Sequence, residues 1–190
     1  MSNTPKFKSQ NNPTIRSNFG IVILVLGIAL ILISLMMVIR PPGNTVLSPP
    51  RVGKFMSNFS ITDVNGNTVE LVDYSGKTIL LNTWATWCPP CRAEMPGLND
   101  YYLRYRGQGF IILAVNVGES VAQAAAFADE YNLSFPVLMD KNYQLVDSLG
   151  INSYPTSILI GSDGRVKYIH IGLLTPDMLA KTITPLWTEN

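Results

Sequence analysis

The longest apolar stretch of the chain runs from Gly20 to Ile39 and contains no charged residue. A helix needs about 20 consecutive apolar residues to cross the hydrocarbon core of a bilayer, and this stretch has that length. We therefore predict a transmembrane helix over residues 19–39, in contact with the lipid bilayer. The alternative is a cleaved signal peptide, with a shorter apolar region of roughly 7–15 residues and a small-x-small site after it. No such site is evident in residues 35–42, so we favour an uncleaved anchor.

The basic residues around this stretch predict its orientation. Lys6, Lys8 and Arg16 precede it without any acidic residue, whereas the other 11 of the 14 basic residues follow it together with all 13 acidic residues. The positive-inside rule therefore places the N-terminus in the cytoplasm and the remainder of the chain outside the cell membrane. Arg40 lies on the flank where this rule does not expect a basic residue.

Two polar segments border the predicted anchor. Residues 1–18 are rich in Ser, Asn, Lys and Pro, and we expect them to form a disordered cytoplasmic tail because they have little apolar surface to bury. Residues 40–52 contain two Pro-Pro pairs, which favour an extended linker. A folded domain is expected over residues 53–190.

The first part of that domain has the pattern of a β-hairpin followed by a buried strand. Residues 59–63 and 68–71 alternate apolar and polar positions on either side of Asn65-Gly66, the strongest short-range hairpin signal. Residues 78–83 form a nearly continuous apolar run, which is typical of a strand buried on both faces.

A strand, helix, strand unit follows. Met95, Leu98, Tyr102 and Tyr105 have helical spacing, with Pro96 expected to kink the helix, and residues 110–117 form a second apolar run. This order predicts a parallel pair of strands with a right-handed crossover. The remaining predicted elements are a helix over 121–131, a strand over 135–139, a helix over 143–149, a hairpin of strands 157–160 and 166–171, and a helix over 176–186. The fold class is therefore α/β, a mixed sheet flanked by helices.

The composition adds little beyond this pattern. The chain has 14 Lys and Arg residues against 13 Asp and Glu residues and is 47% hydrophobic. It has neither the net charge nor the basic clusters that characterise nucleic-acid-binding proteins, and no nucleic-acid partner is expected.

The candidate chemistry lies in the only two cysteines of the chain, Cys88 and Cys91, between the first buried strand and the following helix. The N–H groups and dipole of a helix N-terminus stabilise a nearby thiolate. The spacing therefore indicates a reversible dithiol/disulfide couple in which Cys88 attacks a partner and Cys91 resolves the mixed disulfide.

Other interpretations of the cysteine pair fit less well. A zinc site normally needs four ligands, and the chain offers only one histidine, His170, far away on a predicted edge strand. A structural disulfide with so short a loop would remove little entropy from the unfolded chain. A thiol peroxidase would use a lone reactive cysteine, and a non-catalytic binding module would have lost one cysteine. A disulfide-forming oxidase remains an alternative. No cofactor or metal is expected.

The motif Trp-Ala-Thr-Trp-Cys-Pro-Pro-Cys-Arg-Ala-Glu-Met-Pro and the later Tyr-Pro-Thr resemble the thioredoxin superfamily, and more narrowly its membrane-anchored ResA/TlpA group of thiol–disulfide oxidoreductases. The resemblance implies a thioredoxin-like sheet with an N-terminal β-hairpin and a central helix–strand insertion. It also implies a cis peptide at Pro155, with Tyr154 presenting its backbone to the substrate. Trp87, next to Cys88, and Pro89 are expected to contact the substrate as well.

The resemblance also points to Glu94. Thioredoxins carry a buried acid on the strand before the motif, where this chain has Asn82, which cannot take a proton. In the ResA-like group a glutamate three residues after the second cysteine is thought to replace it. Glu94 has that position and would lie on the helix face of Cys91, where it could accept the proton of the Cys91 thiol. The plainer interpretation is an acid favoured by the helix dipole.

The resemblance implies a tethered reductase of protein disulfides outside the cytoplasm, for example of apocytochrome c during cytochrome c maturation. Since the chain has only two cysteines, a separate thiol protein must supply the electrons, and we expect it to be a membrane electron donor. Arg92 either supports Cys88 electrostatically or is a solvated charge of the first helical turn.

Overall fold

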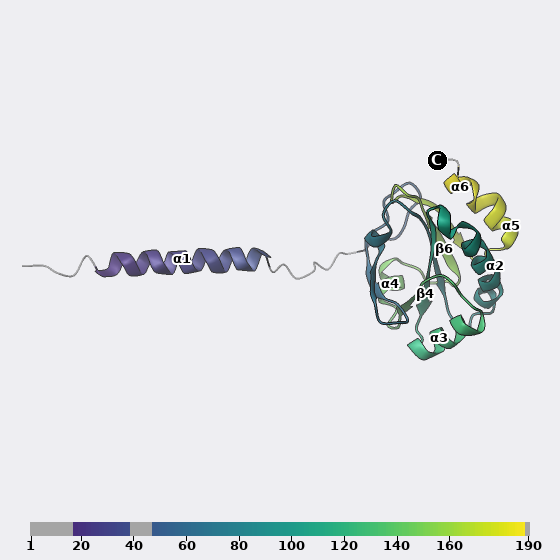
Figure 1. Cartoon of the computed structure of the whole chain (residues 1–190), viewed down its shortest axis with the longest axis horizontal. Helices are drawn as coiled ribbons and strands as arrows, with labels where there is room; N and C mark the ends of the chain where they lie inside the picture. Colours follow the sequence, from purple (N-terminus) through teal and green to yellow (C-terminus); the bar gives the residue numbers. More distant parts are fainter. Residues whose placement is uncertain (1–16, 39–46, 189–190) are drawn as a thin grey trace, which may run out of the picture. The chain divides into compact units, whose positions relative to one another are not determined.

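The computed structural model describes residues 17–38 and 47–188 and divides into two compact units, residues 1–44 and 45–190. Residues 1–16 of the predicted tail and residues 40–46 of the predicted linker lie outside the described residues. In the first unit, α1 covers Ser17–Val38 (Figure 1). A search of the described residues finds no helix with the length and apolarity that crossing a membrane requires.

The second unit is built on a five-stranded mixed sheet with the order β5-β4-β3-β6-β7. The central strand β3 pairs in parallel with β4 and antiparallel with β6, while β5 and β7 form the edges. These strands are Thr78–Trp84 (β3), Phe110–Val117 (β4), Val137–Asp140 (β5), Thr156–Ile160 (β6) and Val166–Ile171 (β7). The predicted mixed sheet, its parallel β3–β4 pair and its antiparallel β6–β7 hairpin are confirmed.

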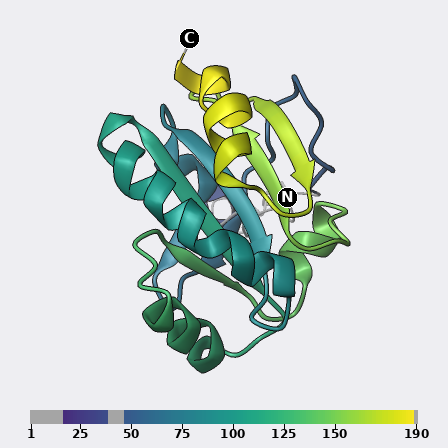
Figure 2. The ribbon, with the colours of Figure 1, turned by 90° about the vertical axis from the view of Figure 1, so that its right-hand side faces the viewer.

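Helices cover the sheet because its central strands are apolar on both faces. Every residue of β3 and β4 is buried, as their uninterrupted apolar runs require. Figure 1 shows α2 and α4 on opposite sides of the strands, and Figure 2 shows α2 beside the C-terminal helices. The helices are α2 (Pro89–Tyr105), α3 (Val121–Glu130), α4 (Gln144–Ser148), α5 (Pro176–Met178) and α6 (Pro185–Thr188), with short turns η1 (Leu71–Tyr74), η2 (Arg106–Gln108) and η3 (Leu179–Ile183).

The N-terminal hairpin is also present as predicted. Strands β1 (Ser60–Thr62) and β2 (Thr68–Glu70) pair antiparallel. Gly66 in the turn has a φ of +85°, a conformation that glycine adopts without strain. Asp63 next to the turn forms a bridge to Leu138 of β5, so the hairpin continues the edge of the sheet.

The C-terminal helix differs from the single helix expected over residues 176–186. It is divided into α5, a π-helical turn η3 and α6. Pro185 has no N–H to donate to the preceding turn. The turn widens there, so that both the N–H and the hydroxyl of Thr184 donate to the Leu179 carbonyl at 2.9 Å.

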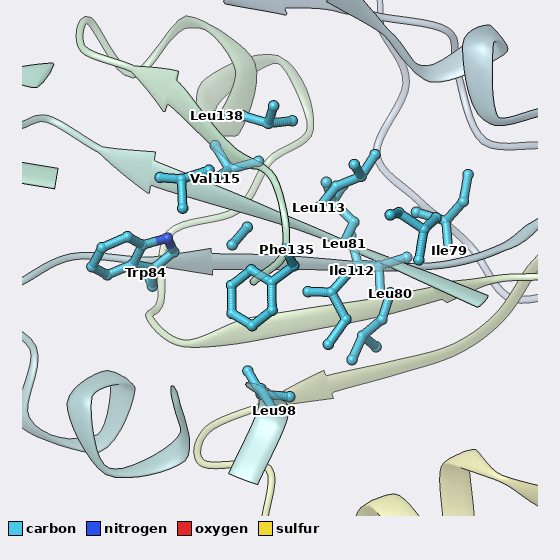
Figure 3. Close-up of a cluster of buried hydrophobic side chains, with 14 of the residues drawn as sticks. Ile79, Leu80, Leu81, Trp84, Leu98, Ile112, Leu113, Val115, Phe135 and Leu138 are labelled. Atoms are coloured by element: carbon cyan, nitrogen blue, oxygen red, sulfur yellow. The ribbon is translucent and has the colours of Figure 1, made fainter. Parts of the chain in front are cut away.

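The core lies where α2 and α3 meet the central strands. Figure 3 shows Leu98 of α2 pointing toward the side chains of the strands, with Phe135 beside it. Trp84 is fully buried and its ring lies 4.8 Å from that of Phe127 on α3. This packing fixes the end of β3, from which the cysteine motif projects.

Candidate active site: the Cys88–Cys91 disulfide and buried Glu94

The two cysteines form a disulfide at the N-terminus of α2, with an S–S distance of 2.02 Å. Cys88 is the N-cap residue, in an extended conformation, and Pro89 and Pro90 begin the helix. Because neither proline has an N–H, the first amide available to the sulfur is that of Cys91, and it donates to Cys88 Sγ at 3.3 Å. The same N–H and the helix dipole would stabilise a Cys88 thiolate in the reduced protein.

The surroundings of the disulfide distinguish its two sulfurs. Cys91 is fully buried, whereas Cys88 retains 3% of its surface and is bordered by exposed Trp87 and Pro89. A partner protein would therefore reach the sulfur of Cys88 first.

The loop before β6 lies beside this surface. The Tyr154–Pro155 peptide is cis, as the resemblance implied. The Tyr154 ring packs edge-on against that of Trp87, with 6.3 Å between the ring centroids. The fold thus brings together Trp87 and Tyr154, two of the predicted substrate-contacting residues, across 67 positions of sequence.

Glu94 is buried one helical turn after Cys91, with 2% of its surface exposed. One carboxylate oxygen accepts from Asn82 Nδ2 at 2.8 Å, and the other accepts from the Leu174 N–H at 2.7 Å. Burial raises the pKa of Glu94 from its ordinary 4.5 to about 7, although both hydrogen bonds act to lower that pKa. The carboxyl can therefore exchange a proton at neutral pH.

Asn82 holds this carboxyl without adding a charge. Its Nδ2 donates to Glu94 and also to Ser157 Oγ at 3.0 Å, across the β3–β6 pair. Its Oδ1 is buried and has no partner among the described protein atoms. A polar side chain in the centre of a buried strand is explained here by its two donated hydrogen bonds.

Glu119, after β4, is a site residue that the sequence analysis did not identify. It is 7% exposed, accepts from the Thr86 N–H at 2.8 Å and from Asn116 Nδ2 at 2.7 Å, and also accepts from the Thr86 hydroxyl. These bonds fix the backbone two residues before Cys88. The sequence did contain a signal for this site residue. Asn116 is a polar residue near the end of an apolar run, and an acidic residue follows it closely.

Two other candidates from the sequence lie beside the site. The Arg92 guanidinium lies over the ring of Phe127 on α3, at 5.3 Å, and over that of Tyr131 just after α3, at 5.5 Å, and so points toward α3. His170, on the edge strand β7, forms a hydrogen bond with the Leu173 carbonyl. Residues 17–38 and 47–188 contain no cluster of His, Cys, Asp and Glu able to hold a metal ion.

Comparison with known proteins agrees with this geometry. The AhpC/TSA family pattern matches residues 52–169. The thiol-disulfide oxidoreductase ResA of Halalkalibacterium halodurans is 40% identical over 129 residues, covering 68% of this chain and 73% of that protein. For ResA of Bacillus anthracis the identity is 40% over 138 residues, covering 71% and 80%.

Two solved structures extend the comparison to the fold. StoA from Bacillus subtilis superimposes with a TM-score of 0.56 at 26% identity, covering 65% of this chain and 93% of that chain. A thioredoxin family thiol:disulfide interchange protein from Chlorobium tepidum gives a TM-score of 0.59 at 25% identity, covering 69% and 90%.

Proposed function

The chain belongs to the AhpC/TSA family as a ResA-like thiol–disulfide oxidoreductase, and we propose that it reduces protein disulfides, with Cys88 as nucleophile and Cys91 as resolving cysteine. The observation that carries this proposal is the placement of both sulfurs at the N-terminus of α2, with a buried carboxyl of pKa about 7 one turn later. The helix N-terminus favours deprotonation of the Cys88 thiol, and the buried carboxyl can take the proton of the Cys91 thiol. The reaction needs both deprotonations.

The first step uses the accessible sulfur. The Cys88 thiolate attacks one sulfur of the substrate disulfide, a new S–S bond forms, and the other substrate sulfur leaves as a thiolate that takes a proton from solvent. The Cys91 N–H, which contacts Cys88 Sγ in the oxidised form at 3.3 Å, stabilises the attacking thiolate.

The second step needs a proton acceptor because Cys91 is fully buried. In our proposal Glu94 takes the proton of the Cys91 thiol, and the resulting thiolate attacks Cys88 Sγ. The mixed disulfide breaks, and the second substrate sulfur leaves. Two electrons have then passed from the Cys88–Cys91 dithiol to the substrate, which regenerates the disulfide seen here.

The proposed substrate-binding surface surrounds Cys88. It combines the exposed Trp87 and Pro89 with the backbone of Tyr154 before cis-Pro155. The substrate class we propose is a protein carrying a Cys-x-x-Cys disulfide, such as the haem-attachment motif of apocytochrome c. Since both cysteines of the chain are consumed in each turnover, a separate thiol protein in the membrane would restore the dithiol.

We further propose that residues 19–39 anchor the domain in the cell membrane, with the N-terminus in the cytoplasm and the catalytic domain outside. The support is the uncharged run Gly20 to Ile39, of which residues 20–38 lie within the 22-residue helix α1, and the basic residues before it. Alkaline extraction of membranes and protease accessibility in spheroplasts test this part separately from the chemistry.

The function is tested by the reduction potential of the Cys88–Cys91 couple in the full chain, equilibrated with defined thiol buffers. A value near or below thioredoxin's roughly −270 mV supports a reductase, whereas a value near DsbA's roughly −120 mV identifies an oxidase and refutes the proposal. Reduction of an oxidised haem-attachment peptide, absent in Cys88→Ser, then tests the substrate class.

A further inference from the structure

A single peptide unit connects His170 to Glu94. The carbonyl of Leu173 lies 3.2 Å from His170 Nε2, and the N–H of Leu174, which belongs to the same peptide plane, donates to Glu94 at 2.7 Å. A carbonyl oxygen can only accept, so Nε2 must carry the proton in this contact. His170 and Glu94 therefore occupy opposite ends of one peptide dipole.

The sheet holds His170 in this position. In the registers of the sheet, His170 of β7 is paired with Ser157 of β6, and Ser157 with Asn82 of β3. Paired residues of neighbouring strands project from the same face, so this row leads from the half-buried His170 toward the side chains that hold Glu94. The imidazole also stacks almost parallel on Tyr168, with 6.3 Å between centroids.

The loop between β7 and α5 is held at three successive residues. Gly172 donates its N–H to the Pro155 carbonyl at 2.8 Å, Leu173 accepts from His170, and Leu174, fully buried, donates to Glu94. This loop thus contacts both cis-Pro155 and the buried Glu94 carboxyl. Of these three contacts, the one with His170 is the only one made by a side chain of the edge strand.

We propose that His170 is a positioning residue for the proton acceptor: its Nε2–H fixes the Leu173–Leu174 peptide so that the Leu174 N–H points at the Glu94 carboxylate. Hydrogen bonds in series also polarise one another, with a strengthening of about 10–30% per bond. Donation to the Leu173 carbonyl therefore makes the Leu174 N–H a stronger donor and favours the ionised carboxyl.

Other charged groups around Glu94 and His170 are engaged elsewhere. On α2, Arg92 points toward α3. On the C-terminal helices, Asp177 and Lys181 pair with each other at 2.7 Å in solvent. On β7, Lys167 pairs with Asp163, and Tyr168 stacks on His170. Strands β3 and β6 carry no ionisable side chain.

The test compares His170→Phe with His170→Gln in the full chain. Phenylalanine keeps a ring against Tyr168 but has no donor, whereas glutamine keeps an N–H donor that cannot be ionised at neutral pH. The pKa of Glu94 is followed in the oxidised protein by carbon-13 NMR of its carboxyl, assigned through the signal lost in Glu94→Gln.

Because the Leu174 hydrogen bond lowers the pKa of Glu94, its weakening in His170→Phe should raise that pKa, by on the order of 0.3 pH unit. His170→Gln should return it to the wild-type value. An unchanged pKa in His170→Phe, or an equal rise in both variants, would overturn the positioning role. Thermal unfolding shows whether either variant has lost the fold. If His170→Phe has, His170→Leu, which also lacks a donor, takes its place in the comparison with His170→Gln.

The positioning of the Leu173–Leu174 peptide by His170 can be tested without assuming that Glu94 accepts a proton. Only its consequence for the reaction rests on the proposed function, so the two proposals can fail separately. If the NMR shift appears and the pH profile of disulfide exchange moves with it, both stand. If the NMR shift appears and the exchange profile does not move, His170 positions the peptide as proposed, and the proton-transfer role of Glu94 is refuted.

Discussion

Replacing Glu94 with glutamine should change how the stability of the domain depends on pH. Burial raises the pKa of Glu94 from 4.5 to about 7, so the folded protein binds this proton more tightly than the unfolded chain does. The corresponding stability is fully present below pH 4.5 and is lost as the pH rises through 7. At about 1.4 kcal/mol per pH unit, the loss is about 3 kcal/mol. Glutamine carries no ionisable proton, and its amide oxygen can still accept one of the two hydrogen bonds.

The assay is urea unfolding of the oxidised full chain at several pH values between 4 and 8.5, for the wild type and for Glu94→Gln. The free energy of unfolding of the variant relative to the wild type should rise by about 3 kcal/mol across this range. Glu130→Gln, on an exposed side chain of α3, controls for the loss of a glutamate as such. Two parallel stability curves for wild type and Glu94→Gln would refute the conclusion that Glu94 is a buried carboxyl titrating near neutrality.

Three further predictions concern the surroundings of the disulfide. Glu119→Gln weakens three hydrogen bonds at Thr86 and Asn116 and should cost about 1–3 kcal/mol in urea unfolding; wild-type stability would show that the loop before Cys88 does not depend on this carboxylate. Cys91→Ser should abolish turnover and trap a mixed disulfide on Cys88, visible on non-reducing gels. If the mixed disulfide forms instead on Cys91 in the Cys88→Ser variant, the assigned roles of the two cysteines are reversed. Trp87→Ala removes a side chain that is 61% exposed, so the free energy of unfolding should change by less than about 0.5 kcal/mol. The rate of reduction of protein disulfides should fall, whereas the rate with a small disulfide should not. Equal losses with both substrates would argue against contact between Trp87 and the substrate protein.

The sequence predicted those elements whose signals are local. The apolar runs of β3 and β4, the Asn65-Gly66 turn and the Asp163-Gly164 turn between β6 and β7 each specify their own structure. The position of the cysteines before a helical pattern placed the reactive sulfur at the start of a helix. The resemblance to known families added the cis-proline and Glu94.

The missing parts depend on contacts between distant segments. The Leu174 N–H lies 80 residues from Glu94 in the sequence. Because the donor is a backbone group, the residue type at position 174 does not reveal it. The bonds from Thr86 to Glu119 span 33 residues, and Glu119 follows its strand as an ordinary loop acid would. The π-helical turn η3 precedes Pro185, a proline inside an otherwise helical pattern. The sequence periodicity does not show that the backbone widens at this point.

The amide at position 82 has a consequence for the energetics of electron transfer. Because Asn82 contributes no charge, the pKa of Glu94 depends on its burial and on its hydrogen bonds with Leu174 and Asn82 rather than on a second acid. Each proton taken up together with the electron pair changes the midpoint potential by about 30 mV per pH unit. If reduction of the disulfide alters the affinity of Glu94 for its proton, the plot of potential against pH must bend close to neutrality. A domain on the outer side of a membrane, as proposed, would then have a driving force that follows the acidity of its surroundings.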